Sequence, residues 1–291
     1  MKILITGHSG FIGKYLQKIL NDQNFDLVFA SNSNGVDVSD WNQVKNFCGF
    51  DVIIHLANLS FVPQSYKNPL KFYQTNYLST LNMLELCRIN EAKFIFLSSY
   101  IYGRPLYQPI DEGHPTSAFN PYAQTKVICE SLCEGYNRDF EIAVDIFRPF
   151  NIYGTGQNSK FLIPSIILQA QKGIIKIKDE NPKRDYIHVE DIVRAIKASI
   201  DNHSSKETKN SSSINFYNLG LGESHSVKEI IDIVKKISVN NITYECTNEK
   251  RPNEIMDTKA DISKAQKDLN WEPKIGIEEG LQKMMSDISS K

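Results

Sequence analysis

A glycine-rich turn between the first predicted strand and the first predicted helix constrains this chain more than any other feature. Residues 3–5 form a short apolar run, and an amphipathic helical pattern extends from about residue 11 to residue 20. Between them stand Gly7, Gly10 and Gly13. Gly7 permits a tight turn, Gly10 lets the backbone approach a pyrophosphate, and Gly13 allows the helix to pack closely on the strand. Because a helix N-terminus also offers N–H donors and a positive dipole, this context predicts a dinucleotide-binding site.

Short apolar runs then alternate with helical segments through the first half of the chain. Strands are predicted at residues 27–30, 52–56, 94–97 and 143–147. Such alternation is typical of a parallel sheet with helices on both faces, so we expect an α/β fold with a Rossmann-like, doubly wound parallel sheet. The alternation weakens after residue 151, which predicts a smaller C-terminal α/β domain. The polar stretch 201–213 indicates an exposed connector.

Composition argues against several classes of partner. The formal net charge is -1 and no long cluster of Lys or Arg occurs, so the basic surface typical of nucleic-acid or anionic-membrane binding is not expected. No apolar stretch reaches ~18 residues and the first residues indicate a strand rather than a signal peptide, so we expect a cytoplasmic protein. The five cysteines contain no Cys-x-x-Cys pair, which argues against a disulfide framework or a zinc site. A small-molecule partner is favoured.

The end of the second predicted strand bears on the choice of cofactor. A dinucleotide fold that prefers NAD places an acidic residue there to bind the adenosine ribose, whereas residues 31–34 of this chain read Ser-Asn-Ser-Asn. Hydroxyl and amide groups can hydrogen-bond a 2′-phosphate, and no carboxylate repels it. NADPH is therefore favoured and NAD is possible. Asp37 is a candidate partner for the adenine amino group, although Asp37 or Asp40 could equally be a helix cap.

Tyr122 and Lys126 form a second candidate site. Their four-residue spacing places both side chains on one face of the helix predicted after Pro121. A free tyrosine has a pKa near ~10 and is a poor acid or base at neutral pH unless a positive charge stabilises the phenolate. We expect Lys126 to supply that charge and to lower the pKa of Tyr122. On spacing alone, a surface Tyr/Lys contact is the more frequent explanation of such a pair, so other motifs must decide.

With the glycine turn, the Tyr/Lys pair resembles the extended short-chain dehydrogenase/reductase family, in particular its nucleotide-sugar epimerases, dehydratases and reductases. Further motifs follow in the family's order along nearly the whole chain. They are His55-Leu56-Ala57, the segment from Pro69 to Asn76, Ser98-Ser99-Tyr100-Ile101-Tyr102-Gly103, Arg148-Pro149-Phe150-Asn151, Arg184-Asp185-Tyr186-Ile187-His188, Tyr217-Asn218-Leu219-Gly220 and Arg251-Pro252. The resemblance implies an NAD(P)-binding domain at residues 1–156 with a returning segment at about 184–216. A nucleotide-sugar-binding domain would occupy about 157–183 and 217–291.

The resemblance also implies roles for individual residues. Spacing back from Gly103 favours Ser98 over Ser99 as the catalytic serine, which acts with Tyr122 and Lys126 and without a metal. The residues implied at the cofactor are Gly7, Ser9, Gly10, Phe11, Ile12, Gly13, Ser31, Asn32, Asp37, Val38, Leu56, Ala57, Asn76, Tyr122, Lys126 and Phe150. Those implied at a nucleotide-diphosphate sugar are Ser60, Ser99, Tyr100, Asn151, Phe161, Arg184 and Arg251, with the two arginines at the diphosphate. A homodimer packed through helices of the cofactor domain is implied as well.

The implied chemistry is hydride transfer between a nicotinamide and a sugar carbon, with Tyr122 exchanging the proton on the oxygen of that carbon. A 4,6-dehydratase needs an Asp-Glu pair after its catalytic hydroxyl residue, and this chain has Ser99 and Tyr100 there. We therefore expect NADPH-dependent reduction of a nucleotide-linked 4-keto-6-deoxyhexose in surface polysaccharide synthesis, with Tyr122 as general acid. The alternative is an NAD-dependent nucleotide-sugar 4-epimerase, similar to UDP-glucose 4-epimerase. A non-catalytic dinucleotide sensor is a remote third alternative. Such proteins commonly lack the catalytic tyrosine, whereas this chain has Tyr122.

Overall fold

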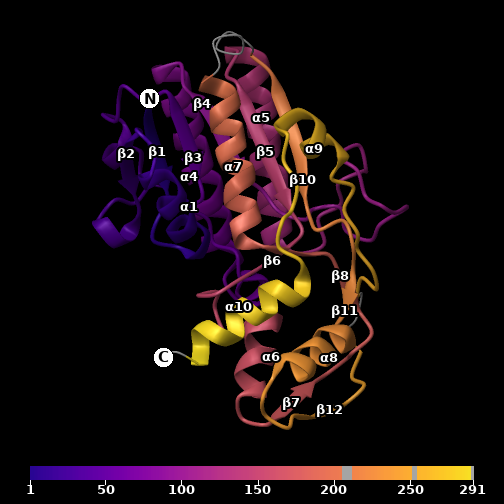
Figure 1. Cartoon of the computed structure of the whole chain (residues 1–291). Helices are drawn as coiled ribbons and strands as arrows, with labels where there is room; N and C mark the ends of the chain where they lie inside the picture. The colour runs from indigo at the N-terminus through magenta and orange to yellow at the C-terminus, as the bar shows by residue number, and fades with distance from the viewer. Residues whose placement is uncertain (205–211, 251–253, 290–291) are drawn as a thin grey trace.

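A six-stranded parallel sheet forms the larger part of the molecule (Figure 1). The computed structural model describes residues 1–204, 212–250 and 254–289. The strands of the sheet are β1 (Lys2–Thr6), β2 (Asp26–Ala30), β3 (Val52–His55), β4 (Lys93–Leu97), β5 (Val144–Pro149) and β10 (Ile214–Leu219). Their order is β10-β5-β4-β3-β1-β2, so the chain changes direction across the sheet between β1 and β3. The predicted strands and the doubly wound sheet are confirmed, with strand ends shifted by one or two residues.

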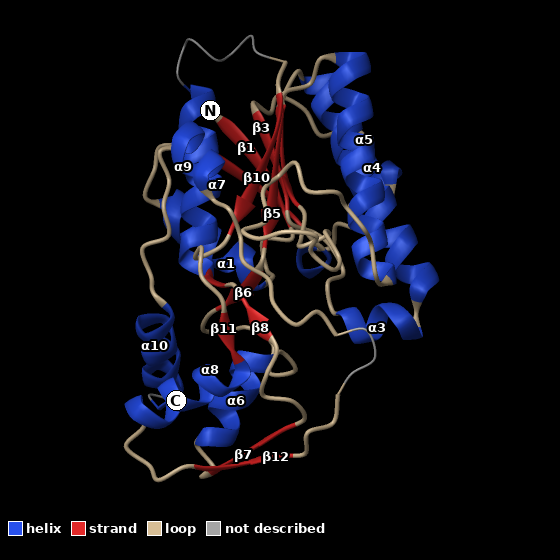
Figure 2. Cartoon of the chain, turned by 90° about the vertical axis from the view of Figure 1, so that its right-hand side faces the viewer, coloured by secondary structure: helices blue, strands red, loops and turns tan. Residues whose placement is uncertain are grey.

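Helices cover both faces of this sheet (Figure 2). One face carries α1 (Phe11–Asn21), α7 (Val189–Ser204) and α9 (Ser263–Leu269), and the other carries α4 (Pro69–Asn90) and α5 (Pro121–Phe140). Side chains of a strand point alternately to the two faces, so Ile3 and Ile5 join the core under α1 and α7 while Leu4 joins the core under α4. All three are fully buried, as expected for a parallel sheet.

Three short helical segments connect the strands. They are η1 (Asn32–Asn34), α2 (Trp41–Val44) and α3 (Val62–Lys67). Asp40 caps α2 by accepting the N–H of Asn42 at 3.0 Å, which is the capping role considered for this part of the sequence. The predicted connector 201–213 is wrong at its start, because α7 continues to Ser204, and residues 205–211 lie outside the described residues.

A smaller lobe lies beyond the carboxyl ends of the strands, because β5 leads directly into β6 and β10 leads into β11 (Figures 1 and 2). Its elements are β6 (Asn151–Tyr153), α6 (Leu162–Ala170), β7 (Ile174–Ile177), β8 (Lys183–Arg184), β9 (Tyr186–His188), β11 (His225–Ser226), α8 (Val227–Ile237), β12 (Thr243–Cys246) and α10 (Ile277–Ser289). The apolar faces of α6, α8 and α10 enclose a separate core with β7. None of the described helices is long and apolar enough to cross a membrane. The predicted domain boundaries stay a prediction.

Candidate functional site

The turn between β1 and α1 is packed too closely to accept side chains at two of its glycines. Gly7 has φ +68°, and a Cβ added there would lie 2.7 Å from the backbone nitrogen of Ala57. A Cβ on Gly13 would lie 2.5 Å from the carbonyl oxygens of both Gly7 and His8. The turn therefore holds backbone against the end of β3, and no side chain caps the N-terminus of α1 among the described residues, which leaves the N–H groups of its first turn available to a ligand. This cradle fits a pyrophosphate, and it brings the predicted cofactor residues of the turn together with Ala57.

Ser9 in this turn faces the end of β2. Its Oγ lies 3.4 Å from the Oγ of Ser31, which in turn lies 2.7 Å from the Oγ of Ser33. Ser31 also caps η1, because its N–H donates to the Asn34 side chain at 2.8 Å. The residues that follow β2 therefore present hydroxyl groups and no carboxylate, and Asn32 is exposed beside them.

The predicted adenine partner Asp37 is exposed and engaged locally. One of its carboxylate oxygens accepts the N–H of Ser39 at 2.9 Å and the hydroxyl of Ser39 at 2.6 Å. The next residue, Val38, is buried in the core under α4. The carboxylate of Asp37 thus shapes the loop after η1.

Asn76 connects the loop after β3 with α5. It is fully buried on α4, accepts the N–H of Leu59 at 2.8 Å and donates to the carbonyl of Leu59 at 3.1 Å. Its amide nitrogen also donates to the Thr125 hydroxyl at 2.9 Å. The loop that carries the exposed Ser60 is therefore fixed to the helix that carries Tyr122 and Lys126.

Tyr122 and Lys126 lie on the first two turns of α5, which starts where the sequence predicts. Pro121 occupies the first helical turn, and Asn120 caps the helix by accepting the N–H of Ala123 at 2.8 Å. The Nζ of Lys126 lies 6.0 Å from the centre of the Tyr122 ring and donates to the carbonyl oxygen of Leu97 at 2.7 Å. The two side chains share one helix face and approach the end of β4, so a surface contact does not describe them.

The expected effect of Lys126 on Tyr122 is wrong for this state of the protein. Burial raises the pKa of Tyr122, and a hydrogen bond from Ser99 opposes that shift. Burial also lowers the pKa of Lys126 to about 8. The spacing of the two residues placed them correctly, but the desolvation of both groups outweighs the attraction expected from the ammonium.

Two serines at the end of β4 differ in their contacts. Ser99 hydrogen-bonds to Tyr122. The hydroxyl of Ser98 is buried and has no partner among the described residues, and its backbone N–H donates to Phe147 at 2.8 Å. A buried hydroxyl without a partner costs free energy, which is the pattern expected where a ligand oxygen completes the site. Beside them, the Tyr100 hydroxyl donates to the Gly103 carbonyl at 2.5 Å.

The predicted substrate residues of the smaller lobe surround the link between β8 and β9. Asn151 donates through both its backbone N–H and its side chain to the carbonyl of Asp185, at 3.0 and 3.2 Å. Arg184 donates to the carbonyl of Ile255 at 2.6 Å and forms an ion pair with Glu254. Arg251 lies outside the described residues.

Aromatic side chains contact one another among the predicted substrate residues. Phe150 packs edge-on against Tyr100 at 5.1 Å between ring centres. Phe161, at the start of α6, meets Phe61 at 5.6 Å in the same manner. Phe61 and Glu254 contact predicted substrate residues but were not predicted. The position of Phe61 next to Ser60 was the available signal for it, while Glu254 carries no motif.

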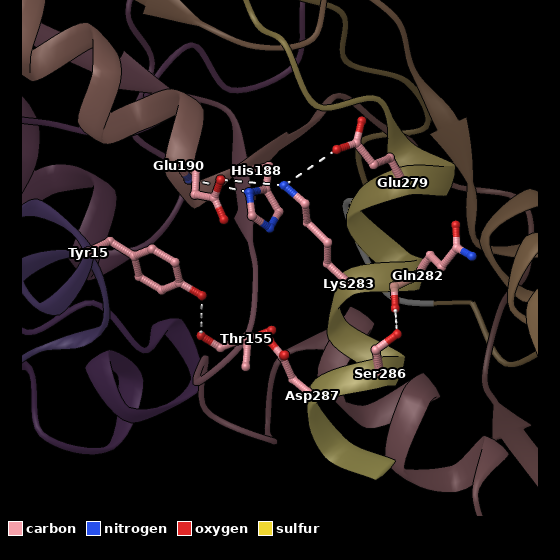
Figure 3. Close-up of a pocket in the computed structure, with 9 residues that line it drawn as sticks. All are labelled: Tyr15, Thr155, His188, Glu190, Glu279, Gln282, Lys283, Ser286 and Asp287. Atoms are coloured by element: carbon pink, nitrogen blue, oxygen red, sulfur yellow. Dashed lines mark hydrogen bonds and ion pairs between the residues drawn. The ribbon is translucent and has the colours of Figure 1, made fainter. Parts of the chain in front are cut away.

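A polar cavity of about 430 Å³ lies apart from these residues, between α1 and α10 (Figure 3). Its lining residues are Tyr15, Thr155, His188, Glu190, Glu279, Gln282, Lys283, Ser286 and Asp287. His188 accepts the N–H of Glu190 at 3.3 Å through Nδ1, and burial lowers its pKa to about 4, so the ring is neutral at pH 7. Lys283 lies between Glu190 and Glu279, at 3.5 and 3.4 Å. None of the predicted catalytic side chains reaches this cavity.

Comparison with known proteins gives a consistent assignment. The model of the family described as "NAD dependent epimerase/dehydratase family" matches residues 3–220. The UDP-glucose 4-epimerase of Bacillus subtilis (strain 168) is 30% identical, over 96% of this chain and 94% of that protein. The structure of RMD from Pseudomonas aeruginosa complexed with NADPH superposes with a TM-score of 0.87 at 26% identity, over 99% of each chain. The UDP-glucose 4-epimerase from Bifidobacterium longum, solved with NAD+ and UDP, gives 0.86 at 26% identity, over 100% of this chain and 99% of that one.

Proposed function

Because the chain belongs to the NAD dependent epimerase/dehydratase family, we propose that it interconverts the C4 epimers of a nucleotide-diphosphate sugar with a retained NAD(H). The observation that carries the proposal is the 30% identity to a UDP-glucose 4-epimerase over nearly the full length of both proteins. The expected resemblance to the extended short-chain dehydrogenase/reductase family is confirmed. Of the two reactions expected from the sequence, the alternative has the stronger support.

The turn at Gly7 and Gly13 fits the pyrophosphate of such a cofactor, because backbone there leaves no room for a Cβ and α1 presents free N–H groups. A bound nicotinamide supplies a hydride acceptor and donor for C4 of the sugar. Asn76, Phe150 and Ser31 are among the residues proposed to complete the cofactor site.

The chain's own residues would move the proton. Tyr122 takes the proton of the C4 hydroxyl as that carbon becomes a ketone, and returns it to the same oxygen when hydride comes back to the other face of the carbon. Ser98, whose buried hydroxyl has no partner among the described residues, would donate a hydrogen bond to that oxygen. The hydrogen bond from Ser99 favours the phenolate form of Tyr122, and Lys126 is proposed to hold the cofactor beside it.

Dehydration has no equivalent support. It requires a group that removes a proton from carbon and another that protonates the departing hydroxyl. The residues that follow Ser98 are Ser99 and Tyr100, and the Tyr100 hydroxyl is already engaged by the Gly103 carbonyl. Burial raises the pKa of Tyr100 further, so it is a poor base at neutral pH.

Keto reduction with NADPH is the second candidate, and one specific observation favours it. The end of β2 presents the hydroxyls of Ser31 and Ser33 and no carboxylate, which suits a 2′-phosphate. The NADPH complex of RMD, at 26% identity, agrees with this.

Two measurements distinguish these functions. Mass spectrometry of the purified protein should find bound NAD(H), and UDP-galactose should convert to UDP-glucose with no added cofactor. Consumption of NADPH with a 4-keto sugar and no cofactor-free interconversion would instead assign the reductase. The variant Tyr122→Phe should lose turnover by about 100-fold or more and keep its cofactor. A variant with unchanged turnover would contradict both enzymatic functions and favour a sensor.

A further inference from the structure

Asp185 joins three backbone segments around the predicted substrate residues. It is fully buried between β8 and β9. Its carboxylate accepts the N–H groups of Leu221 at 2.6 Å and Gly222 at 3.1 Å, which follow β10, and of Ala260 at 3.0 Å. The segment at residue 260 and the end of β10 are therefore fixed to the β8–β9 link by one side chain.

The backbone of the same residue holds Asn151. The carbonyl of Asp185 accepts both the main-chain and side-chain N–H groups of Asn151. The side chain of its neighbour Arg184 binds Ile255 and Glu254, which belong to the same segment as Ala260. One residue thus contacts Asn151 and shares a backbone segment with Arg184, and both of these residues are proposed to bind the nucleotide-diphosphate sugar.

The carboxylate of Asp185 accepts hydrogen bonds and does not pair with any cation that the structure describes. No Lys or Arg among the described residues forms an ion pair with it, although burying an unpaired charge is costly. An ionised carboxylate offers enough acceptor sites for all three N–H donors. The space is closely filled as well, because a Cβ on Gly220 would lie 2.7 Å from Oδ2 of Asp185.

We propose that Asp185 is the positioning residue of the nucleotide-diphosphate site, which it builds by fixing Arg184 and Asn151 against the 254–260 segment. The inference rests on the proposed function, since it names the part of that site that determines affinity for the nucleotide. It assigns Asp185 no contact with the cofactor and no part in proton transfer. Loss of the carboxylate should therefore raise KM for the nucleotide sugar and leave kcat and cofactor retention nearly unchanged.

The chain offers a matched control in Asp191. This residue is also fully buried and also holds C-terminal backbone, because it accepts the N–H groups of Lys274 at 2.8 Å and Ile275 at 3.2 Å. Its backbone partners lead into α10 and its ion pair is with Arg194 on α7, so it holds neither Arg184 nor Asn151. Asp185→Asn and Asp191→Asn should both lower the melting temperature, but only the first should disturb the nucleotide site.

The test is calorimetric titration of UDP into the purified wild type and both variants, with KM and kcat for UDP-galactose measured alongside. We expect Asp185→Asn to weaken UDP binding and to raise KM by about tenfold or more, with kcat changed by less than about threefold, and Asp191→Asn to match the wild type in KM. Gly220→Ala, which crowds the carboxylate without removing it, should weaken UDP in the same direction and serves if Asp185→Asn does not fold. Equal UDP affinity in wild type, Asp185→Asn and Gly220→Ala would overturn this inference but leave the proposed function intact. A wild type that binds no UDP would overturn the proposed function and the inference with it.

Discussion

The Nζ atom of Lys126 donates a hydrogen bond to the carbonyl oxygen of Leu97, the last residue of β4, at 2.7 Å. The bond fixes α5 against the strand that leads into Ser98, so all three predicted catalytic residues are held at the carboxyl end of β4. It also buries the ammonium, which lies 4.6 Å from the Phe96 ring, and burial lowers the pKa of Lys126 to about 8. The charge that we propose supports catalysis is therefore close to its titration point at neutral pH.

The first prediction concerns the alkaline side of the pH profile. A lysine is charged below its pKa, so activity that needs the Lys126 ammonium is present below about pH 8 and is lost as the pH rises through that value. We expect kcat/KM to fall by about tenfold per pH unit above this point. Lys126→Arg keeps a charge at all these pH values, so it should be slower but lack the alkaline decline. A wild-type profile that stays flat to about pH 10 would contradict the assignment.

The second prediction separates the two serines. Ser98→Ala removes a buried hydroxyl that has no partner among the described residues, so the free energy of unfolding should rise by about 1 kcal/mol while turnover falls by about 100-fold. Ser99→Ala removes the hydrogen bond that lowers the pKa of Tyr122, so turnover should fall by a smaller factor. Turnover and thermal unfolding of both variants check this. A larger loss in Ser99→Ala would transfer the catalytic assignment to Ser99.

The third prediction tests the glycine turn. In Gly13→Ala the new Cβ would meet the carbonyl oxygens of Gly7 and His8 at 2.5 Å, and backbone cannot move aside as the end of a side chain can. The variant should lose at least about tenfold in dinucleotide affinity, measured by fluorescence titration after the bound cofactor is removed. Gly135→Ala in α5 is the control, because no atom lies within 4 Å of its Cβ and alanine favours a helix. If both variants bind alike, the turn does not hold the cofactor.

The fourth prediction concerns the buried ion pair between Arg148 and Glu130, whose closest atoms are 2.6 Å apart. Both side chains are more than nine-tenths buried, so removing one leaves an uncompensated charge. Glu130→Gln should lower the free energy of unfolding by about 3 kcal/mol in urea titrations. The double variant Glu130→Leu with Arg148→Met should lose less than Glu130→Gln, because neither charge then remains. Equal losses in the two would show that the pair is not what stabilises α5.

Local patterns in the sequence were sufficient for the fold and for the position of the helix with Tyr122. Each of these features depends on residues close together in the chain. They are the alternation of strands and helices, the Gly7–Gly13 turn and Pro121 at the start of a helix. The pKa of Tyr122 was predicted wrongly because spacing reveals the neighbouring Lys126 and not the burial of both groups or the Leu97 carbonyl. The role of each named site residue stays a prediction, as do the homodimer and the choice between NAD and NADP.

Contacts between distant segments could not be predicted. Asp185 stands in a recognised motif, but its three N–H partners come from residues 36 to 75 positions further along the chain. The Phe61–Phe161 contact likewise joins loops 100 residues apart. Such contacts depend on how the smaller lobe sits on the sheet, which periodicity does not encode.

The strand β10 pairs along its whole length with β5, and β5 has no other neighbour on that side. During synthesis, β5 therefore emerges from the ribosome about seventy residues before the strand that covers it. A nascent chain that stops near residue 156 carries an open, apolar sheet edge, which is a known template for aggregation. Separate expression of the N-terminal half should thus give insoluble material, and circular permutants of this chain should keep β5 and β10 within one continuous fragment.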